Sequence, residues 1–79
     1  MTTISLRQLM ANVFECSVDD IDADARINET VGWDSLSHIS LMLELGRQGV
    51  AVAPLQIPEL TTIGAIRKHI GMAGLTVDD

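Results

Sequence analysis

The sequence predicts an all-α domain, and three observations support this fold class. Only 3% of the 79 residues are aromatic, and aliphatic residues supply most of the 47% hydrophobic content, which suits packed helices better than a β-sandwich. Apolar residues recur at helical spacing in three segments. No two strand-like runs stand out that could pair with each other. The length suits one domain over residues 1–79, with a core at about 3–71 and a frayed tail at 72–79.

Charge and composition restrict the expected partners. Eleven acids against five bases give a formal charge of −6, so nucleic acid and anionic membrane surfaces are poor partners. The lone Cys16 cannot form an internal disulfide, and no apolar run approaches the ~20 residues of a membrane span. The N-terminus also lacks a basic stretch followed by an apolar core. We therefore expect a monomeric cytoplasmic protein with no nucleic-acid or membrane partner.

The first expected helix begins at Thr3, with Thr2 or Thr3 as its N-cap, and ends near Glu15. The segment 17–33 breaks the helical period, and repulsion between its carboxylates disfavours a regular helix, so we expect a long acidic loop there. The apolar residues at helical spacing in this helix are Ile4, Leu6, Leu9, Met10, Val13 and Phe14. Three apolar residues should pin the loop to the core: Val18, Ile21 and Ile27.

The second expected helix begins at Asp34 or Ser35 and ends near Gly46 or Gln48. At ~100° per residue, its polar side chains gather on one narrow stripe, and the remaining arc is apolar. So wide an apolar arc should be contacted from more than one side, which makes this helix the central one. The stripe comprises Ser37, Ser40, Glu44, Arg47 and Gln48, and the arc that we expect to be buried comprises Leu36, Ile39, Leu41, Met42, Leu43 and Leu45.

The remaining chain should hold one short helical turn and a last helix. Residues 50–52 are expected to be an extended loop, because no partner strand is evident. Pro54 and Pro58 leave room for at most one short helical turn between them. The last helix should begin at Ile63, capped by one of the two preceding threonines, and should close at Gly71.

Ser35 is the candidate functional residue, and a hydrolase is the first activity to consider. Asp34 precedes it and His38 follows three residues later, so a serine hydrolase triad can be drawn from neighbouring residues. However, residues this close on one short helix face different directions, and no Gly-x-Ser-x-Gly elbow is present. A serine hydrolase is therefore the weakest of the functions considered.

Metal binding is not expected from this sequence. Cys16, His38 and His69 share no short spacing of the kind that zinc sites use. The alternating aspartates of segment 20–24 resemble the opening of a calcium loop, but the required glycine and bidentate glutamate are missing downstream. A solvated acidic loop explains this segment better.

Three features favour a modification site at Ser35 over a simple helix cap. A long acidic loop leads into it, a mostly apolar helix follows it, and Leu36 is expected to anchor that helix in the core. The hydroxyl would then lie at the surface on a rigid element. A phosphodiester on it would sit beside free backbone N–H groups of the helix N-terminus. The alternative is a small helical interaction module in which Ser35 only caps the helix.

Over about residues 3–71 the sequence resembles the acyl carrier proteins of the phosphopantetheine-binding family, of the discrete, stand-alone type. The Asp-Ser-Leu motif alone would be weakly specific, but its distance from the block that opens the last helix strengthens the resemblance. The residues that carry the resemblance are Val18-Asp19-Asp20-Ile21, Asp34-Ser35-Leu36, the helix 39–45, Pro54, and Leu60-Thr61-Thr62-Ile63-Gly64-Ala65-Ile66.

This resemblance implies a four-helix bundle with a short third helix and a long loop between the first two. It also implies a non-enzymatic protein whose Ser35 carries 4′-phosphopantetheine, transferred from coenzyme A by a phosphopantetheinyl transferase. Acyl or aminoacyl groups would ride on its thiol as thioesters, loaded or used by an acyl-activating ligase, a ketosynthase or an acyltransferase. Residues implied to contact such partners are Asp34, Leu36, Trp33, Ser37, Ser40 and Glu44.

The second helix departs from the pattern of general fatty-acid carriers, which usually display several acids there. In this chain Glu44 is its only acid, so apolar contacts must contribute more to docking. We therefore expect a specialised biosynthetic pathway that makes a polyketide, another natural product or a cell-surface component. For Trp33, contact with the arm or a partner and packing against the bundle are left as alternatives.

Overall fold

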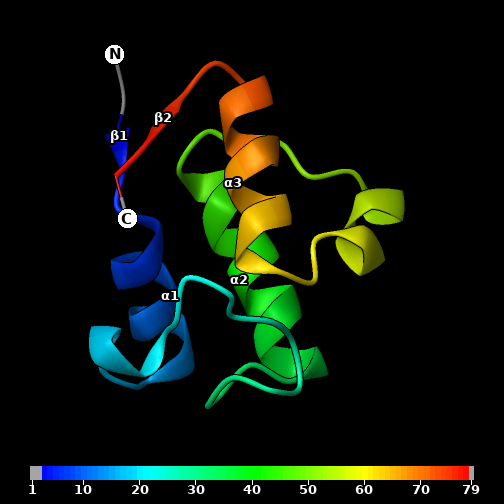
Figure 1. Ribbon diagram of the computed structural model, residues 1–79. Coiled ribbons are helices and arrows are strands. Elements are labelled where there is room, and N and C mark those ends of the chain that lie inside the picture. The colour runs from blue at the N-terminus through cyan, green and yellow to red at the C-terminus, as the bar shows by residue number, and fades with distance from the viewer. Residues whose placement is uncertain (1–2, 79) are drawn as a thin grey trace.

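The computed structural model describes residues 3–78, in which helices surround one apolar core (Figure 1). The predicted four-helix bundle is confirmed, with the short third helix formed by a 3₁₀ segment and a long loop joining the first two α-helices. None of the helices in residues 3–78 has the length and apolar character needed to cross a membrane. In chain order the elements are β1 (Thr3–Ile4), α1 (Leu6–Phe14), η1 (Val18–Asp20), α2 (Ser35–Arg47), η2 (Pro54–Glu59), α3 (Ile63–Met72) and β2 (Thr76–Val77).

The start of the first helix differs from the prediction. Helix α1 begins at Leu6 with Ser5 in the capping position, whereas a start at Thr3 was expected. Thr3 and Ile4 are instead extended, because they pair with β2. The alternative cap, Thr2, lies outside the described residues. The C-terminal end agrees with the prediction, since Glu15 adopts a left-handed conformation (φ 56°) and closes the helix.

The expectation of a frayed C-terminal tail is wrong for residues 75–78. β2 lies parallel to β1, with Thr76 opposite Thr3 and Val77 opposite Ile4, and the N–H of Asp78 donates to the carbonyl of Ile4 at 2.8 Å. The side chains of Leu75 and Val77 also pack against the core. This pairing was not predicted because two-residue strands carry almost no periodic signal.

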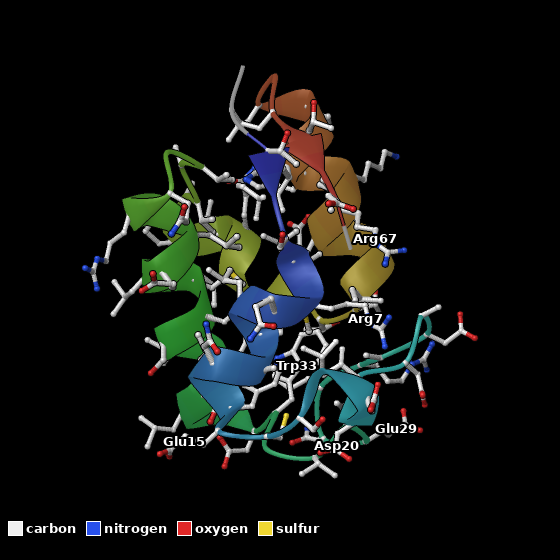
Figure 2. All side chains as sticks on the ribbon, turned by 90° about the vertical axis from the view of Figure 1, so that its left-hand side faces the viewer. Arg7, Glu15, Asp20, Glu29, Trp33 and Arg67 are labelled. Carbon is white, nitrogen blue, oxygen red and sulfur yellow. The ribbon has the colours of Figure 1, made fainter. Side chains whose placement is uncertain are left out.

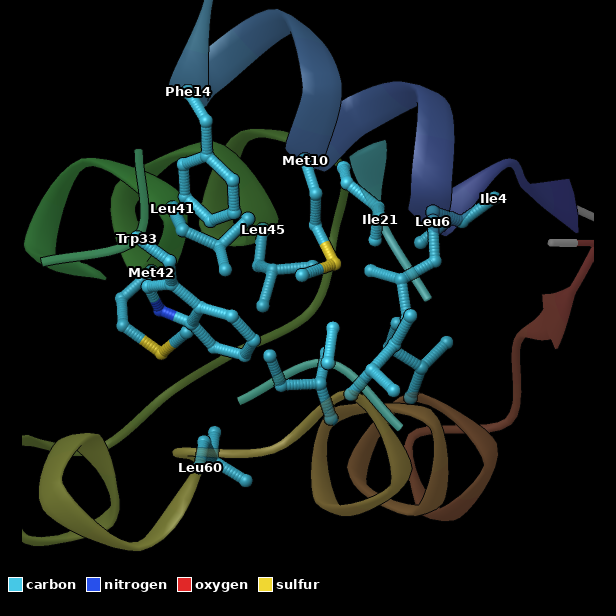
Figure 3. Packing of buried hydrophobic residues seen from close by; sticks show 14 of the residues in the cluster. Ile4, Leu6, Met10, Phe14, Ile21, Trp33, Leu41, Met42, Leu45 and Leu60 are labelled. Carbon is cyan, nitrogen blue, oxygen red and sulfur yellow. The ribbon is translucent and has the colours of Figure 1, made fainter. Parts of the chain in front are cut away.

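Helix α2 spans the predicted residues but buries only one side. Its buried face carries Leu41, Met42 and Leu45, which meet α1 and α3 in the core (Figure 3). Leu36 and Leu43, both expected to be buried, are 75% and 68% exposed. The expected polar stripe therefore borders the exposed face and does not form its centre.

The acidic loop between α1 and α2 is fixed at several points. Arg7 on α1 donates from Nε to the carbonyl of Ile21 at 2.9 Å and from Nη2 to that of Val18 at 3.1 Å (Figure 2). Ile21 is buried, and the predicted contacts of Val18 and Ile27 with the core are present. The N–H of Ile27 also donates to the carbonyl of Thr61, which joins the loop to the chain before α3.

The segment between α2 and α3 follows the prediction except in η2, which spans Pro54–Glu59 and runs through Pro58, whereas at most one short turn between the two prolines was expected. Residues 50–52 form an extended loop, with Val50 fully buried. His69 of α3 holds this loop, since its Nε2 lies 2.8 Å from the carbonyl oxygen of Ala51. Thr62 caps α3 by accepting from the N–H of Ala65 at 3.1 Å, and the helix ends at Met72, one residue beyond the predicted glycine.

Candidate functional site

Asp34, and not Ser35, caps the N-terminus of α2. The Asp34 backbone is extended, and its carboxylate accepts a hydrogen bond from the N–H of Ser37 at 2.8 Å. Ser35 is the first residue of the helix, and its side chain is exposed. Among residues 3–78 we find no hydrogen-bond partner for its hydroxyl. The capping role therefore belongs to its neighbour, and the Ser35 hydroxyl faces solvent.

The local hydrogen bonds keep Asp34 charged. The backbone N–H of Ser37, with a smaller contribution from the Ser37 side chain, lowers the pKa of the Asp34 carboxyl below its ordinary value. A carboxylate fixed in this way stands directly beside Ser35. The site consequently presents one free hydroxyl and one immobilised negative charge to solvent.

The chain enters this site through a close contact with the end of α1. Gly32 has φ +78°, and a Cβ at this position would lie 2.8 Å from both the Cβ and the carbonyl oxygen of Phe14. Every other residue type would be strained by this φ and would collide with Phe14. Gly32 thereby allows the loop to press against α1 immediately before the site.

Trp33 is a core residue and not a surface contact. It is only 1% exposed, and its ring stacks on that of Phe14 with centroids 5.5 Å apart and an interplanar angle of 26° (Figure 3). Of the two alternatives left open by the sequence, packing against the bundle is the one observed. The implied partner contact by Trp33 is wrong, because its side chain is covered.

His38 is the functional-site neighbour that the sequence reasoning missed. The sequence analysis considered it only for a hydrolase triad or a metal site, yet it is a core residue that is 4% exposed. Its Nδ1 accepts from Nε1 of Trp33 at 3.0 Å, and its Nε2 lies 2.7 Å from the carbonyl oxygen of Ile57. A signal was available, because a buried tryptophan usually needs an acceptor for its indole N–H.

The remaining implied contact residues divide between two surfaces. Leu36 does not anchor α2 in the core and instead faces solvent beside Ser35. Ser37 is half-buried and bonded to Asp34, as described above. Ser40 and Glu44 line a groove of about 340 Å³ between α1 and α2, with Leu9, Asn12 and Val13 on its other side.

A family profile described as the phosphopantetheine attachment site matches residues 5–70. The chain belongs to this family of carrier proteins. Such carriers are non-catalytic, hold 4′-phosphopantetheine covalently, and interact with phosphopantetheinyl transferases and acyl-processing enzymes. A search of curated proteins found no match for the chain.

The N-terminal end of α2 can accommodate the covalent group that carriers of this family hold. The exposed Ser35 hydroxyl needs no rearrangement to become a phosphodiester, because Asp34 retains the capping bond. Ser35 and the following Leu36 are both exposed, so an enzyme can reach the hydroxyl. The residues present therefore fit a chain attached at this point.

The geometry does not support a hydrolase triad in the carrier protein. Both ring nitrogens of His38 are engaged, one with Trp33 and one with Ile57, and the ring is buried. The Asp34 carboxylate bonds the backbone of Ser37 and orients no imidazole. Cys16 offers no alternative nucleophile, since burial and the nearby Asp20 carboxylate raise the pKa of its thiol.

Proposed function

We propose that the carrier protein is modified at Ser35 and carries acyl or aminoacyl groups as thioesters on the attached arm. One observation carries this proposal: Ser35 is the exposed first residue of α2, while Asp34 performs the capping. During transfer, Oγ of Ser35 loses its proton and bonds to the β-phosphorus of coenzyme A, and adenosine 3′,5′-bisphosphate leaves. When bound, the group supplies a terminal thiol for thioester formation.

The polypeptide contributes position and recognition to this function. The immobilised Asp34 carboxylate marks the site for the transferase, and α1 and the loop hold the helix end in place through Phe14 and Gly32. The first two N–H groups of α2, at Ser35 and Leu36, lie on the positive side of the helix dipole, which favours a phosphodiester there.

Intact-mass spectrometry tests the assignment of Ser35. The carrier protein is incubated with coenzyme A and a broad-specificity phosphopantetheinyl transferase, and the mass of one added phosphopantetheine is expected. Ser35→Ala should gain nothing, whereas Ser5→Ala, at an exposed serine before α1 whose side chain makes no capping bond, should be modified like wild type. The proposal fails if wild type gains no mass or if Ser35→Ala is still modified.

We further propose that the carrier docks its enzymes mainly through apolar contacts. The outer face of α2, defined here by Leu36, Ile39 and Leu43, presents three large apolar side chains at 75%, 49% and 68% exposure. The acid of this helix, Glu44, lies 3.4 Å from Arg47, which offsets its charge. Such a face gains little electrostatic steering from a basic partner and suits an enzyme surface with apolar pockets.

An apolar docking surface supports the proposal that the carrier acts in a specialised biosynthetic pathway. Its partners would be an acyl-activating ligase, a ketosynthase or an acyltransferase that makes a polyketide, another natural product or a cell-surface component. The same surface argues against general fatty-acid synthesis, whose carriers usually display several acids on this helix.

Transferase kinetics test the apolar character of docking. Leu36→Ala and Leu43→Ala should raise the KM for the carrier more than Glu44→Gln does, and added NaCl should change the wild-type KM only slightly. A larger effect of Glu44→Gln, or a steep dependence on salt, would show that docking is electrostatic.

A further inference from the structure

His38 is an unusual occupant of this core. Within residues 3–78 it is the one polar residue that is buried, and it lies about one helical turn after Ser35. Its backbone N–H donates to the carbonyl of Asp34 at 2.8 Å, which starts the hydrogen-bond ladder of α2. The main chain and the side chain of His38 therefore both connect to residues immediately before Ser35.

The imidazole joins two segments that flank the site. Trp33, which donates to Nδ1, belongs to the chain that enters Ser35, and it is already held by its stacking on Phe14. Ile57, whose carbonyl accepts from Nε2, belongs to η2. Since Nδ1 is an acceptor here, the ring is the Nε2–H tautomer and both nitrogens are satisfied.

These two hydrogen bonds fix the orientation of the groups they join, which apolar packing alone would not do. A leucine of similar size could fill the buried position, although it would leave the Trp33 N–H and the Ile57 carbonyl unpaired at a cost in stability. Hydrogen bonds, however, require a defined angle and distance. A fully satisfied network selects one rotation of the Trp33 ring and one placement of η2 beside the start of α2.

We propose that His38 is a positioning residue for the modification of Ser35, an inference that rests on the function proposed above. By linking Trp33 to Ile57, it holds the entering chain and η2 in the arrangement that a transferase recognises. Without the link, the Ser35 hydroxyl is as reactive as before, but a smaller fraction of the carrier is in the arrangement that the transferase binds. The apparent affinity of the transferase for the carrier falls in proportion to that fraction.

Loading kinetics of His38→Leu test this role. The substitution removes both hydrogen bonds and keeps the position apolar and filled. If the competent fraction falls to about one tenth, the KM for the carrier rises about tenfold and kcat at saturation is retained. His38→Asn, whose side-chain oxygen can accept from Trp33, and His38→Gln, whose amide can donate to Ile57, should each restore part of the lost affinity.

A matched control separates positioning from stability. Ile70→Val also weakens the core, but Ile70 is on the second half of α3 and takes no part in the network. All variants are assayed well below their unfolding midpoints, with folding verified by circular dichroism. The proposal is overturned if folded His38→Leu has the wild-type KM, or if Ile70→Val raises the KM as much at an equal loss of stability.

A second variant keeps the test decisive if His38→Leu does not fold. Trp33→Phe retains an aromatic ring for Phe14 and removes the donor to Nδ1, together with part of a buried ring, so it is compared with Ile70→Val at an equal loss of stability. It should raise the KM less than His38→Leu would, and an unchanged KM would overturn the proposal. If the proposed function itself is wrong, the result differs: either the wild-type protein is not loaded, or Ser35→Ala is still loaded.

Discussion

Asp34 and Ser35 are both good helix-capping residues, and the backbone decides between them. The extended conformation of Asp34 (φ −111°, ψ −174°) places its carboxylate over the N–H of Ser37, while Ser35 already belongs to the first turn. The sequence could locate the helix start to within one residue but could not assign the cap. That one-residue difference leaves the hydroxyl of Ser35 available for chemistry.

Stability measurements can verify this division of roles. Ser35→Ala should leave the free energy of unfolding within about 0.5 kcal/mol of wild type, because an exposed side chain without a hydrogen bond is removed. Asp34→Ala should be clearly destabilising, because the N–H of Ser37 loses its acceptor. Urea denaturation of the unmodified proteins provides both values. The reverse order of effects would make Ser35 the cap.

The lowered pKa of Asp34 predicts a pH dependence. Its contribution to stability is fully present above its ordinary, unfolded-state pKa of about 3.9 and is lost as pH falls through the lower pKa of the folded protein. Asp34→Asn keeps a capping oxygen that does not titrate. The stability difference between wild type and Asp34→Asn should therefore be constant from pH 7 to about 5 and should shift in favour of the variant at lower pH. A difference that stays constant down to about pH 2 would contradict a charged cap.

At the scale of the elements, helical periodicity predicted where α2 lies but not which of its sides is buried. The pattern located the helix correctly, because its bounds depend on local sequence. It could not tell which part of the wide apolar arc would be covered, because this depends on where α1 and α3 lie. Leu41 and Leu45 are fully buried, whereas Leu36 and Leu43 face solvent.

Paired substitutions on α2 measure the difference between these faces. Leu41→Ala should destabilise the protein by about 2–5 kcal/mol, because it leaves a cavity in the core. Leu43→Ala, the same change on the outer face, should stay within about 0.5 kcal/mol of wild type. Equilibrium unfolding monitored by circular dichroism distinguishes them. Similar losses from both variants would mean that the exposed face is wrongly assigned.

The entry to the site depends on contacts between elements that no local pattern reveals. The approach of Gly32 to Phe14 and the bond between Trp33 and His38 both join residues from different segments of the fold. Sequence analysis could single out Ser35 and its motif as the candidate site, because those features are contiguous. It placed Trp33 and His38 less well, since burial of each depends on the other and on η2.

At the scale of the whole molecule, negative charge is concentrated before the site. Seven of the eleven acids fall between residues 15 and 34, while α2 itself has one. Figure 2 shows Glu15, Asp20 and Glu29 at the same lower end of the molecule. Negative charge is therefore carried mainly by the loop, and the outer face of α2, the surface proposed for docking, lies outside this acid-rich part of the chain.

The two short strands should contribute measurably to global stability. Deletion of residues 75–79 removes β2 together with the partly buried Leu75 and Val77 and uncovers Ile4. We expect a loss of about 1–3 kcal/mol from the apolar area that returns to water. Thermal and urea unfolding provide the measurement, with deletion of Asp79 alone as the control. An unchanged midpoint would restore the expectation of a frayed tail.

The strand pair also has a consequence for chain connectivity. Because β1 and β2 are paired, residues 3–4 and 76–77 lie side by side, away from the first turn of α2 in the lower part of Figure 1. The strands are parallel, so a linker from Asp78 back to Thr3 need span only the length of the pair, about 7 Å, and its own turns. New ends could then open in the exposed stretch 22–24. In such a circularly permuted chain the elements would follow one another in a different order, and Ser35 would still stand at the N-terminal end of the same helix.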